Sequence, residues 1–178
     1  VGRPKVDVLA DPKVVANPSN RCYYCKKGIF GAILQAARED GYTTILDGTN
    51  ASDDANDRPG MKALEEYKVL SPLRLCDITK AEVRELSREA GLFTWQKPAY
   101  ACLATRIKCG EEITAEKLKI TEMAENHLSM LGFVDFRVRM EGRSARVQVK
   151  KEQLRHLDTM RGEILNGLKP YYDKIIFD

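Results

Sequence analysis

Hydrophobic and polar positions follow two different periods along the first half of the chain. Short β-branched runs typical of strands occupy residues 5–10, 43–48 and 68–73. Apolar residues recur with helical spacing over residues 24–39, and a shorter helix is expected at 60–66. Strands that alternate with helices in this manner predict an α/β fold built on a parallel sheet.

A further helix in this half is marked at both of its ends. Thr79 and Glu82 have the spacing of a capping box, in which the hydroxyl and the carboxylate each bind a free backbone N–H group. Gly91 follows as a stop signal. We therefore expect a helix that starts after Thr79 and stops at Gly91.

The second half of the chain shows a different order of elements. Thr114 provides a cap for a helix that ends at Gly132, and a strictly alternating run follows it. A turn at residues 141–143 leads into a second alternating run, and a helix over 151–167 precedes the last strand. This order predicts a small α-β-β-α-β unit.

These two patterns are separated by a stretch without sustained periodicity, which is typical of a functional loop or a linker. We expect residues 1–98 to form the parallel-sheet domain and residues 114–178 to form the small α/β domain. Residues 99–113 would be the loop between them.

Composition and charge limit the class of protein. Apolar residues make up 43% and charged residues 31% of the chain, which is typical of a globular protein. The chain contains no apolar run long enough to cross a bilayer and does not start with a signal-like apolar segment, so we expect a cytoplasmic protein without membrane contact. The net charge of +3 gives little support for nucleic-acid binding.

The chain contains five cysteines, which in a reducing compartment serve more often as ligands or catalysts than as a disulfide framework. Cys22 and Cys25 have C-x-x-C spacing beside Arg21, which suits a shared metal or a reactive thiolate. No second pair of cysteines accompanies them in the sequence, so a structural pair without chemistry is the alternative.

Cys102 and Cys109 lie in the loop without periodicity, together with Thr105 and Arg106. A nearby guanidinium and backbone amides favour a thiolate, which suits a cysteine to nucleophilic attack or to iron–sulfur ligation. A buried and inert cysteine is the alternative at each position.

Two further groups of polar residues are candidates for phosphate chemistry. The loop after the strand at 43–48 carries oxygen ligands suited to Mg²⁺ beside phosphates, or it is an ordinary acidic turn. Its residues are Asp47, Asn50, Asp53, Asp54 and Asp57, followed by the cations Arg58 and Lys62. Arg137 and Arg139 share one face of a strand, with Arg143 and Arg146 across the turn, which suits phosphate oxygens or a plain solvated face.

Several long blocks of the sequence resemble the LarE family, in register from about residue 5 to the end of the chain. The blocks are NPSNRCYYCKK, ILDGTNASD, NDRPGMKAL, SPL, ITKAEVRELSREAGL, QKPAYACLATRI and the hairpin from GFVDFRVR to ARVQV. The resemblance implies a partial Rossmann-like PP-loop sheet of the adenine nucleotide alpha hydrolase-like class. It also implies an ATP-dependent and Mg²⁺-dependent sulfur transferase that acts on pyridinium-3,5-biscarboxylic acid mononucleotide, a step toward the nickel-pincer cofactor of lactate racemase.

The implied reaction centres on the cysteine of the CLA(S/T)R motif, which is Cys102 in this sequence. ATP adenylates a substrate carboxylate, and the thiolate attacks the activated carbonyl to give a thioester. Cleavage of the cysteine carbon–sulfur bond leaves a thiocarboxylate on the product and dehydroalanine on the enzyme. The implied phosphate-binding residues are Thr105, Arg106, Arg137 and Arg139, and the implied acidic residues near the substrate are Glu125 and Asp158.

Two departures from the family pattern change this expectation. The SGG-x-DS nucleotide loop is absent, so the resemblance covers the later part of a full enzyme, and adenylation would need the missing ATP-binding segment or a companion chain. Cys76 and Cys109 accompany Cys102, and some relatives of the family hold a 4Fe-4S cluster on three cysteines, which would retain the protein sulfur. The alternatives are a tRNA-thiolating PP-loop relative and a non-catalytic partner subunit, and we expect a homo-oligomer.

Overall fold

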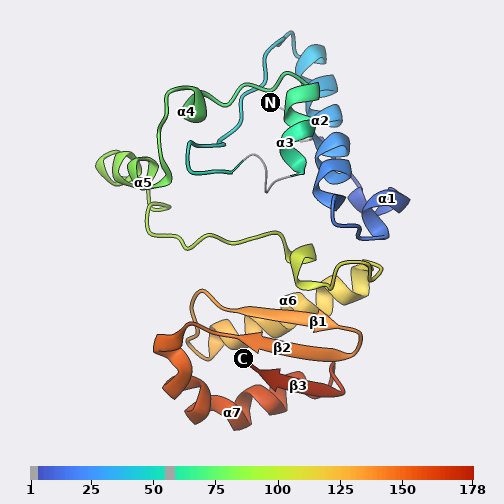
Figure 1. Cartoon of the computed structure of the whole chain (residues 1–178), viewed down its shortest axis with the longest axis vertical. Coiled ribbons are helices and arrows are strands. Elements are labelled where there is room, and N and C mark those ends of the chain that lie inside the picture. The colour runs from blue at the N-terminus through green and yellow to red at the C-terminus, as the bar shows by residue number, and fades with distance from the viewer. Residues whose placement is uncertain (1–3, 55–58) are drawn as a thin grey trace. The chain divides into compact units, whose positions relative to one another are not determined.

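The computed structural model describes residues 4–54 and 59–178. Its contacts divide the chain into two compact units (Figure 1). The first unit comprises the chain up to Val14 together with Pro18–Lys97, and the second comprises Val15–Asn17 together with Pro98–Asp178. Across the described residues, no helix combines the length and the apolar character that a membrane span requires.

The first unit is built mainly from helices. They are the 3-10 helix η1 (Val8–Ala10), α1 (Pro12–Val15), α2 (Arg21–Glu39), α3 (Gly60–Glu66), α4 (Pro72–Leu75) and α5 (Lys80–Glu89). Polar side chains tie α2 to α3, because Glu66 accepts hydrogen bonds from Tyr23 Oη at 3.0 Å and from Lys27 Nζ at 2.9 Å. The helices predicted at 24–39 and 60–66 are confirmed.

The capping box of α5 is also confirmed. The backbone N–H of Glu82 donates to Thr79 Oγ1 at 3.3 Å, and the backbone N–H of Thr79 donates to Glu82 Oε2 at 2.7 Å. Gly91 follows the helix with a φ of 67°, the left-handed conformation that glycine adopts at low cost.

The three strands predicted in this unit, at 5–10, 43–48 and 68–73, are wrong, and the run at 43–48 is irregular apart from one bridge residue. Residues 5–10 form a loop and η1 in place of a strand, because Asp7 caps that turn by accepting from the N–H of Leu9 at 3.0 Å. The run at 68–73 ends early, because Pro72 begins α4. What remains of the parallel pairing is one bridge between Leu46 and Leu70, so the Rossmann-like PP-loop sheet stays a prediction.

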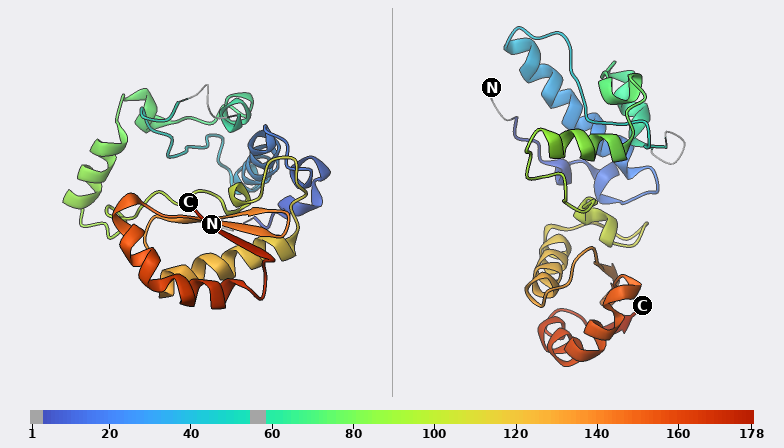
Figure 2. Two further views of the ribbon diagram at one scale, coloured as in Figure 1. Left: turned by 60° about the horizontal axis from the view of Figure 1, so that its bottom comes forward. Right: turned by 90° about the vertical axis from the view of Figure 1, so that its left-hand side faces the viewer.

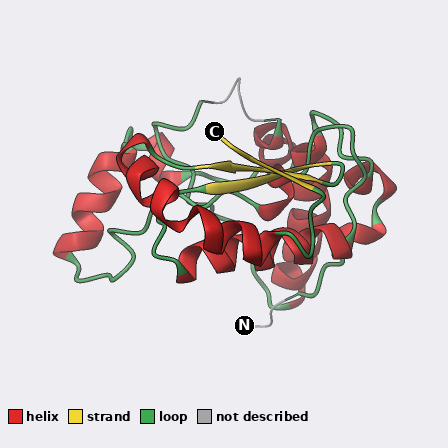
Figure 3. Cartoon of the chain, turned by 90° about the horizontal axis from the view of Figure 1, so that it is seen from below, coloured by secondary structure: helices red, strands yellow, loops and turns green. Residues whose placement is uncertain are grey.

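The second unit has the predicted α-β-β-α-β order, preceded by a 3-10 turn. Its elements are η2 (Leu103–Arg106), α6 (Ala115–Met130), β1 (Arg137–Glu141), β2 (Ser144–Gln148), the 3-10 helix η3 (Lys151–Gln153), α7 (Leu154–Leu168) and β3 (Lys174–Phe177). The sheet has the order β1-β2-β3, with β1 antiparallel and β3 parallel to β2. All named strands of the described chain, yellow in Figure 3, belong to this sheet.

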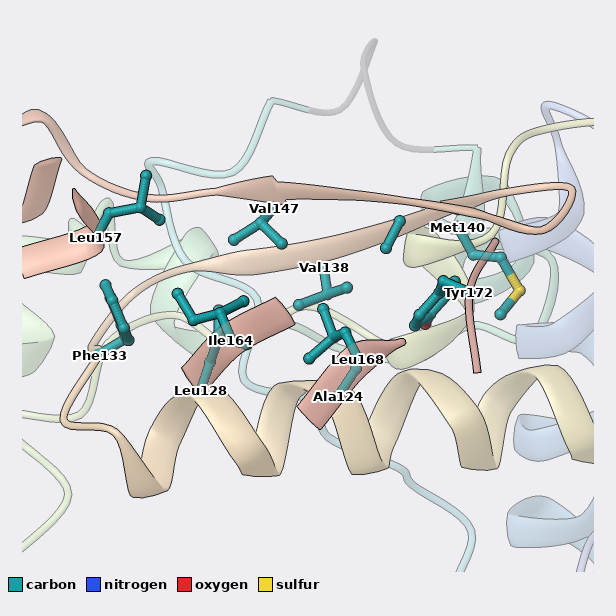
Figure 4. Close-up of a cluster of buried hydrophobic side chains, with 11 residues drawn as sticks. Ala124, Leu128, Phe133, Val138, Met140, Val147, Leu157, Ile164, Leu168 and Tyr172 are labelled. Atoms are coloured by element: carbon teal, nitrogen blue, oxygen red, sulfur yellow. The ribbon is translucent and has the colours of Figure 1, made fainter. Parts of the chain in front are cut away.

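Helices α6 and α7 cover one face of this sheet (Figure 2). Val138 and Val147 point from the strands toward Ala124 and Leu128 on α6, as Figure 4 shows, and all four are at most 1% exposed. The rest of this buried cluster is Phe133, Met140, Ala145, Leu157, Ile164, Leu168 and Tyr172. Burial of this apolar surface holds α6 and the sheet together and fixes which side chains face away from the helices.

The hairpin turn sets the register of the two antiparallel strands. Gly142 has a φ of 56°, as a glycine at the first position of a tight hairpin turn requires. Arg139 then stands directly opposite Arg146, and Arg137 stands opposite Gln148. Because side chains alternate along each strand, these four residues lie on the sheet face that α6 and α7 leave uncovered.

Candidate active site

The predicted nucleophile lies in an exposed turn of the second unit. Cys102 is exposed and immediately precedes η2. Its carbonyl oxygen accepts two bonds from Thr105, one from the backbone N–H at 2.9 Å and one from Oγ1 at 2.7 Å. Cys102 thus lies on a closed turn, and the expectation of a buried cysteine is wrong for this residue.

A buried ion pair fixes the end of this turn. Arg106 Nε lies 2.5 Å from Glu125 Oε1, and the two side chains are 2% and 5% exposed. The backbone N–H of Val138 on β1 also donates to Glu125 Oε1, at 3.1 Å. Arg106 Nη1 donates to Thr105 Oγ1 at 3.0 Å, so the ion pair and the turn form one network.

Tyr100 belongs to the same network, although no pattern in the sequence assigned it a role. Its hydroxyl donates to Glu125 Oε2 at 2.8 Å, and its ring lies 5.4 Å from the guanidinium carbon of Arg106. The residue is 70% exposed, but removal of water from the hydroxyl and its bond to Glu125 raise the pKa of Tyr100 to about 12. The only signal in the sequence was its place beside Cys102 in the block PAYACLATR.

A pocket of about 310 Å³ opens beside this network. Tyr100, Phe133 and Phe136 supply aromatic lining, which suits a flat ring. The charged lining is of both signs, from Arg106, Arg137, Glu125 and Asp135.

The uncovered face of the sheet gathers arginines, as the alternation predicted. Arg139 Nε donates to Gln148 Oε1 at 2.7 Å, and its Nη1 lies 3.5 Å from the carbonyl oxygen of Thr105, which links this face to the cysteine turn. Arg137 is exposed. Arg146 lies 3.9 Å from Glu141 and 3.8 Å from Asp178, which are long distances for ion pairs. These side chains can reorient toward a phosphate.

Two of the candidate residues lie away from this group. Asp158 is exposed on α7, which covers the opposite face of the sheet from Arg137 and Arg139. Arg143, in the hairpin turn, is paired with Asp173 at 2.6 Å, and this hydrogen bond raises the pKa of Arg143. The structure therefore brings Cys102, Thr105, Arg106, Glu125 and Arg139 together through bonded neighbours, and leaves Asp158 and Arg143 outside that group.

Cys109 lies near the C-terminal end of the loop that carries Cys102. Its Sγ lies 3.4 Å from the carbonyl oxygen of Asn17, and the N–H of Gly110 donates to that oxygen at 2.8 Å. The side chain of Asn17 donates to the carbonyls of Ile107 and Lys108 at 3.4 and 2.9 Å. Asn17 is 1% exposed and has a φ of 51°, a conformation that asparagine tolerates better than most residues. No pattern in the sequence pointed to this residue.

The remaining cysteines lie in the first unit. Cys22 and Cys25 stand in the first turns of α2, and Arg21 Nη2 lies 3.8 Å from Cys22 Sγ. Cys76 is exposed at the C-terminal end of α4. Among the described residues, no group of three or more His, Cys, Asp or Glu side chains is arranged to hold a metal ion.

The predicted Mg²⁺ loop is held by hydrogen bonds within the first unit. Asp47 accepts from Ser71 Oγ and from Thr49 Oγ1, each at 2.6 Å. Partial burial raises the pKa of Asp47, but these hydrogen bonds outweigh that effect and leave it below the ordinary value. Asp53 accepts from the N–H of Asn50 at 3.0 Å, and Asp54 is exposed. Asp57 and Arg58 lie outside the described residues.

A cleft of about 880 Å³ borders this loop in the first unit. Ser71, which bonds Asp47, lines it, together with Tyr23, Lys62 and Arg74. It exceeds the pocket beside Tyr100 in volume, but its lining residues all belong to the unit without Cys102. The two cavities therefore mark two separate candidate binding regions, and neither has a cysteine among its lining residues.

Comparison with known proteins supports the family resemblance in its broad form. The chain is 41% identical to an uncharacterized protein of Synechocystis sp. over 165 residues, which are 92% of this chain and 62% of that protein. It is 31% identical to an uncharacterized protein of Methanocaldococcus jannaschii over 164 residues, which are 92% of this chain and 64% of that protein. No family model matches the chain.

One relative has a named activity. The chain is 32% identical to the pyridinium-3,5-bisthiocarboxylic acid mononucleotide synthase of Lactiplantibacillus plantarum over 149 residues, which are 84% of this chain and 54% of the synthase. This similarity supports a LarE-like protein. The chain spans less than two thirds of the length of each of these three relatives.

Proposed function

We propose that this chain belongs to the LarE family and carries the sulfur-donating part of an ATP-dependent sulfur transferase. The observation that carries the proposal is the exposed Cys102 turn, bonded through Thr105 and Arg106 to a buried carboxylate and to the arginine face of the sheet. The similarity to a synthase whose name denotes a bisthiocarboxylic acid mononucleotide agrees with it. The proposed substrate is the corresponding pyridinium biscarboxylic acid mononucleotide.

The proposed chemistry follows from the groups that this unit brings together. Adenylation of a substrate carboxylate makes AMP the leaving group, and the thiolate of Cys102 forms a carbon–sulfur bond as the carbon–oxygen bond to AMP breaks. Loss of the Cα proton and cleavage of the Cβ–S bond then leave the sulfur on the substrate and dehydroalanine at position 102. Arg137, Arg139 and Arg146 would bind the mononucleotide phosphate.

The ATP-side function is proposed for the loop of the first unit. Asp47, Asn50 and Asp53 present the oxygen ligands that Mg²⁺ prefers, and Lys62 and Arg74 line the adjoining cleft. We propose that adenylation also needs an ATP-binding segment or a companion chain that supplies a phosphate-binding loop.

A cluster-based form of the same activity is the alternative. Cys76, Cys102 and Cys109 are all exposed thiols, and thiolates are the ligands of 4Fe-4S clusters. When bound, such a cluster would supply a sulfide that leaves the cysteine intact. Anaerobic reconstitution with iron and sulfide, followed by visible absorption, tests it, and loss of the chromophore in Cys76→Ser would support this ligand set.

The decisive experiment for the sacrificial route uses Cys102→Ala, with Cys109→Ala as the matched control from the same loop. With ATP, Mg²⁺, the biscarboxylic acid mononucleotide and the ATP-binding segment or companion chain that adenylation needs, we expect the wild type and Cys109→Ala to form the thiocarboxylate product. We expect Cys102→Ala to form none. Intact mass should show the wild type losing about one H₂S per chain. Product formation by Cys102→Ala at the wild-type rate would refute the role of this thiol.

A further inference from the structure

We propose that Glu125 is a positioning residue that holds the Cys102 turn at both of its ends, with Tyr100 as the second anchor beside Arg106. The inference deepens the proposed function, because it assigns residues that set the place of the reactive thiol. It also differs from the role that the family resemblance implies for Glu125, which is that of an acidic group near the substrate.

Tyr100 and Arg106 bracket Cys102 along the chain and reach the same carboxylate. Tyr100 Oη donates to Glu125 Oε2 at 2.8 Å, and Arg106 Nε donates to Oε1 at 2.5 Å. Glu125 itself is fixed, because α6 carries it and it is 4% exposed. The segment from Tyr100 to Arg106 is therefore a loop with both ends tied to one rigid point.

The carboxylate of Glu125 has no acceptor position left for a substrate. It accepts four contacts from described groups, because Arg106 Nη2 lies 3.4 Å from Oε2 and the N–H of Val138 lies 3.1 Å from Oε1, in addition to the two anchors. A carboxylate offers about four lone-pair sites. The acceptor positions of Glu125 are thus used by protein groups. We therefore infer that Glu125 positions the Cys102 turn and does not bind the substrate.

The anchor at Tyr100 depends on its hydroxyl more than on burial of its ring. The residue is 70% exposed, and the ring has a cation–π contact with Arg106 as well as the bond to Glu125. Substitution by phenylalanine keeps the ring and removes only the bond. Tyr100→Phe should therefore release the first end of the turn while the buried pair of Arg106 and Glu125 stays in place.

Residue-resolved hydrogen exchange tests the clamp without any substrate. The N–H of Thr105 donates to the carbonyl of Cys102 inside the turn, and the N–H of Gly110 donates to Asn17 outside it. In Tyr100→Phe we expect exchange at Thr105 to accelerate about tenfold, since a hydrogen bond to a charged group is lost, while Gly110 changes less than about twofold. Tyr42→Phe, in the first unit, is the matched control and should change neither.

Kinetics of sulfur transfer complete the test, because a misplaced nucleophile lowers the rate of the chemical step and not substrate binding. Because each chain gives up its sulfur once, the rate is measured in a single turnover. At saturating substrate the single-turnover rate constant of Tyr100→Phe should be about tenfold lower or more, while the substrate concentration that gives half of the maximal rate stays unchanged. Unchanged exchange at Thr105, or accelerated exchange with an unchanged single-turnover rate constant, would overturn the clamp. Activity of Cys102→Ala would instead overturn the proposed function while leaving the exchange result intact, so the two failures can be told apart.

Discussion

At the scale of single residues, the arginines differ in their burial and in their bonding partners. This difference distinguishes an arginine that supports the fold from arginines that are available to bind an anion. Arg106 is buried, and its guanidinium binds Glu125 and Thr105. Arg137 is exposed, and the distances from Arg146 to Glu141 and Asp178 are 3.9 and 3.8 Å. A buried charge that loses its partner is strongly destabilising, and an exposed one is not. The fixed arginine therefore supports the fold, and the available ones are suited to binding an anion.

This difference predicts the effect of removing each arginine on stability. Arg106→Ala leaves the carboxylate of Glu125 buried without its cation, which should lower the free energy of unfolding by about 3–5 kcal/mol. Arg143→Ala removes a cation of the same type from an ion pair whose arginine is 75% exposed, and should leave the urea midpoint nearly unchanged. Urea denaturation followed by circular dichroism measures both, and equal midpoints for the two variants would contradict this assignment.

At the scale of elements, helix α6 matters because it carries Glu125 to the Cys102 turn. Its first turn is capped by Thr114, whose Oγ1 accepts from the N–H of Lys117 at 3.1 Å. The helix then runs to Met130, and Gly132, with a φ of 87°, turns the chain toward β1. Capping thus acts at a distance on the candidate site, through the position of α6.

Loss of this cap should be measurable. Thr114→Ala leaves an N–H group of the first turn without its acceptor and should lower the free energy of unfolding by about 1 kcal/mol. Thr159→Ala is the matched control, because Thr159 lies inside α7 and its hydroxyl donates back to the carbonyl of Arg155. That variant should be neutral or slightly stabilising, since alanine is the better helix former. Equal losses in thermal denaturation of the two variants would argue against the cap.

The sequence predicted those elements whose signals are local. The box of Thr79 and Glu82, the cap at Thr114 and the turn at Gly142 each involve residues close in the chain, and the structure confirms all three. The strand at 5–10 was mispredicted because the side chain of Asp7 competes for the backbone, an effect that β-branched content does not reveal. In a segment of only six residues, one such side-chain hydrogen bond is enough to favour a turn over a strand.

The residue types of the candidate site were predictable from the sequence, but the hydrogen bonds that join them were not. Cys102 and the paired arginines stand in recognisable patterns, while the bond from Tyr100 to Glu125 joins residues 25 positions apart, and that from Asn17 to Lys108 joins residues 91 apart. Spacing along the chain carries no information on such contacts. An exposed tyrosine and a single asparagine before a proline therefore gave no signal of their own.

At the scale of the whole molecule, the two units are not two consecutive segments. Val15–Asn17 groups with the second unit, although the residues on both sides of it belong to the first. This short segment bonds the loop that carries both cysteines, since the N–H groups of Gly110 and Ile113 donate to the carbonyls of Asn17 and Val15 at 2.8 and 2.9 Å. Part of the support of the cysteine loop thus comes from a distant part of the sequence.

Asn17 should therefore stabilise the second unit although it lies in the N-terminal part of the chain. Asn17→Gly suits the φ of 51° but removes the donor to the carbonyls of Ile107 and Lys108, so local opening of the loop should become easier by about 1–3 kcal/mol. Hydrogen exchange should accelerate at Gly110, while Leu70, bonded to Ile45 in the first unit, stays protected. Equal acceleration at both amides would mean that Asn17 stabilises the whole chain. It would contradict the prediction that Asn17 stabilises the second unit in particular.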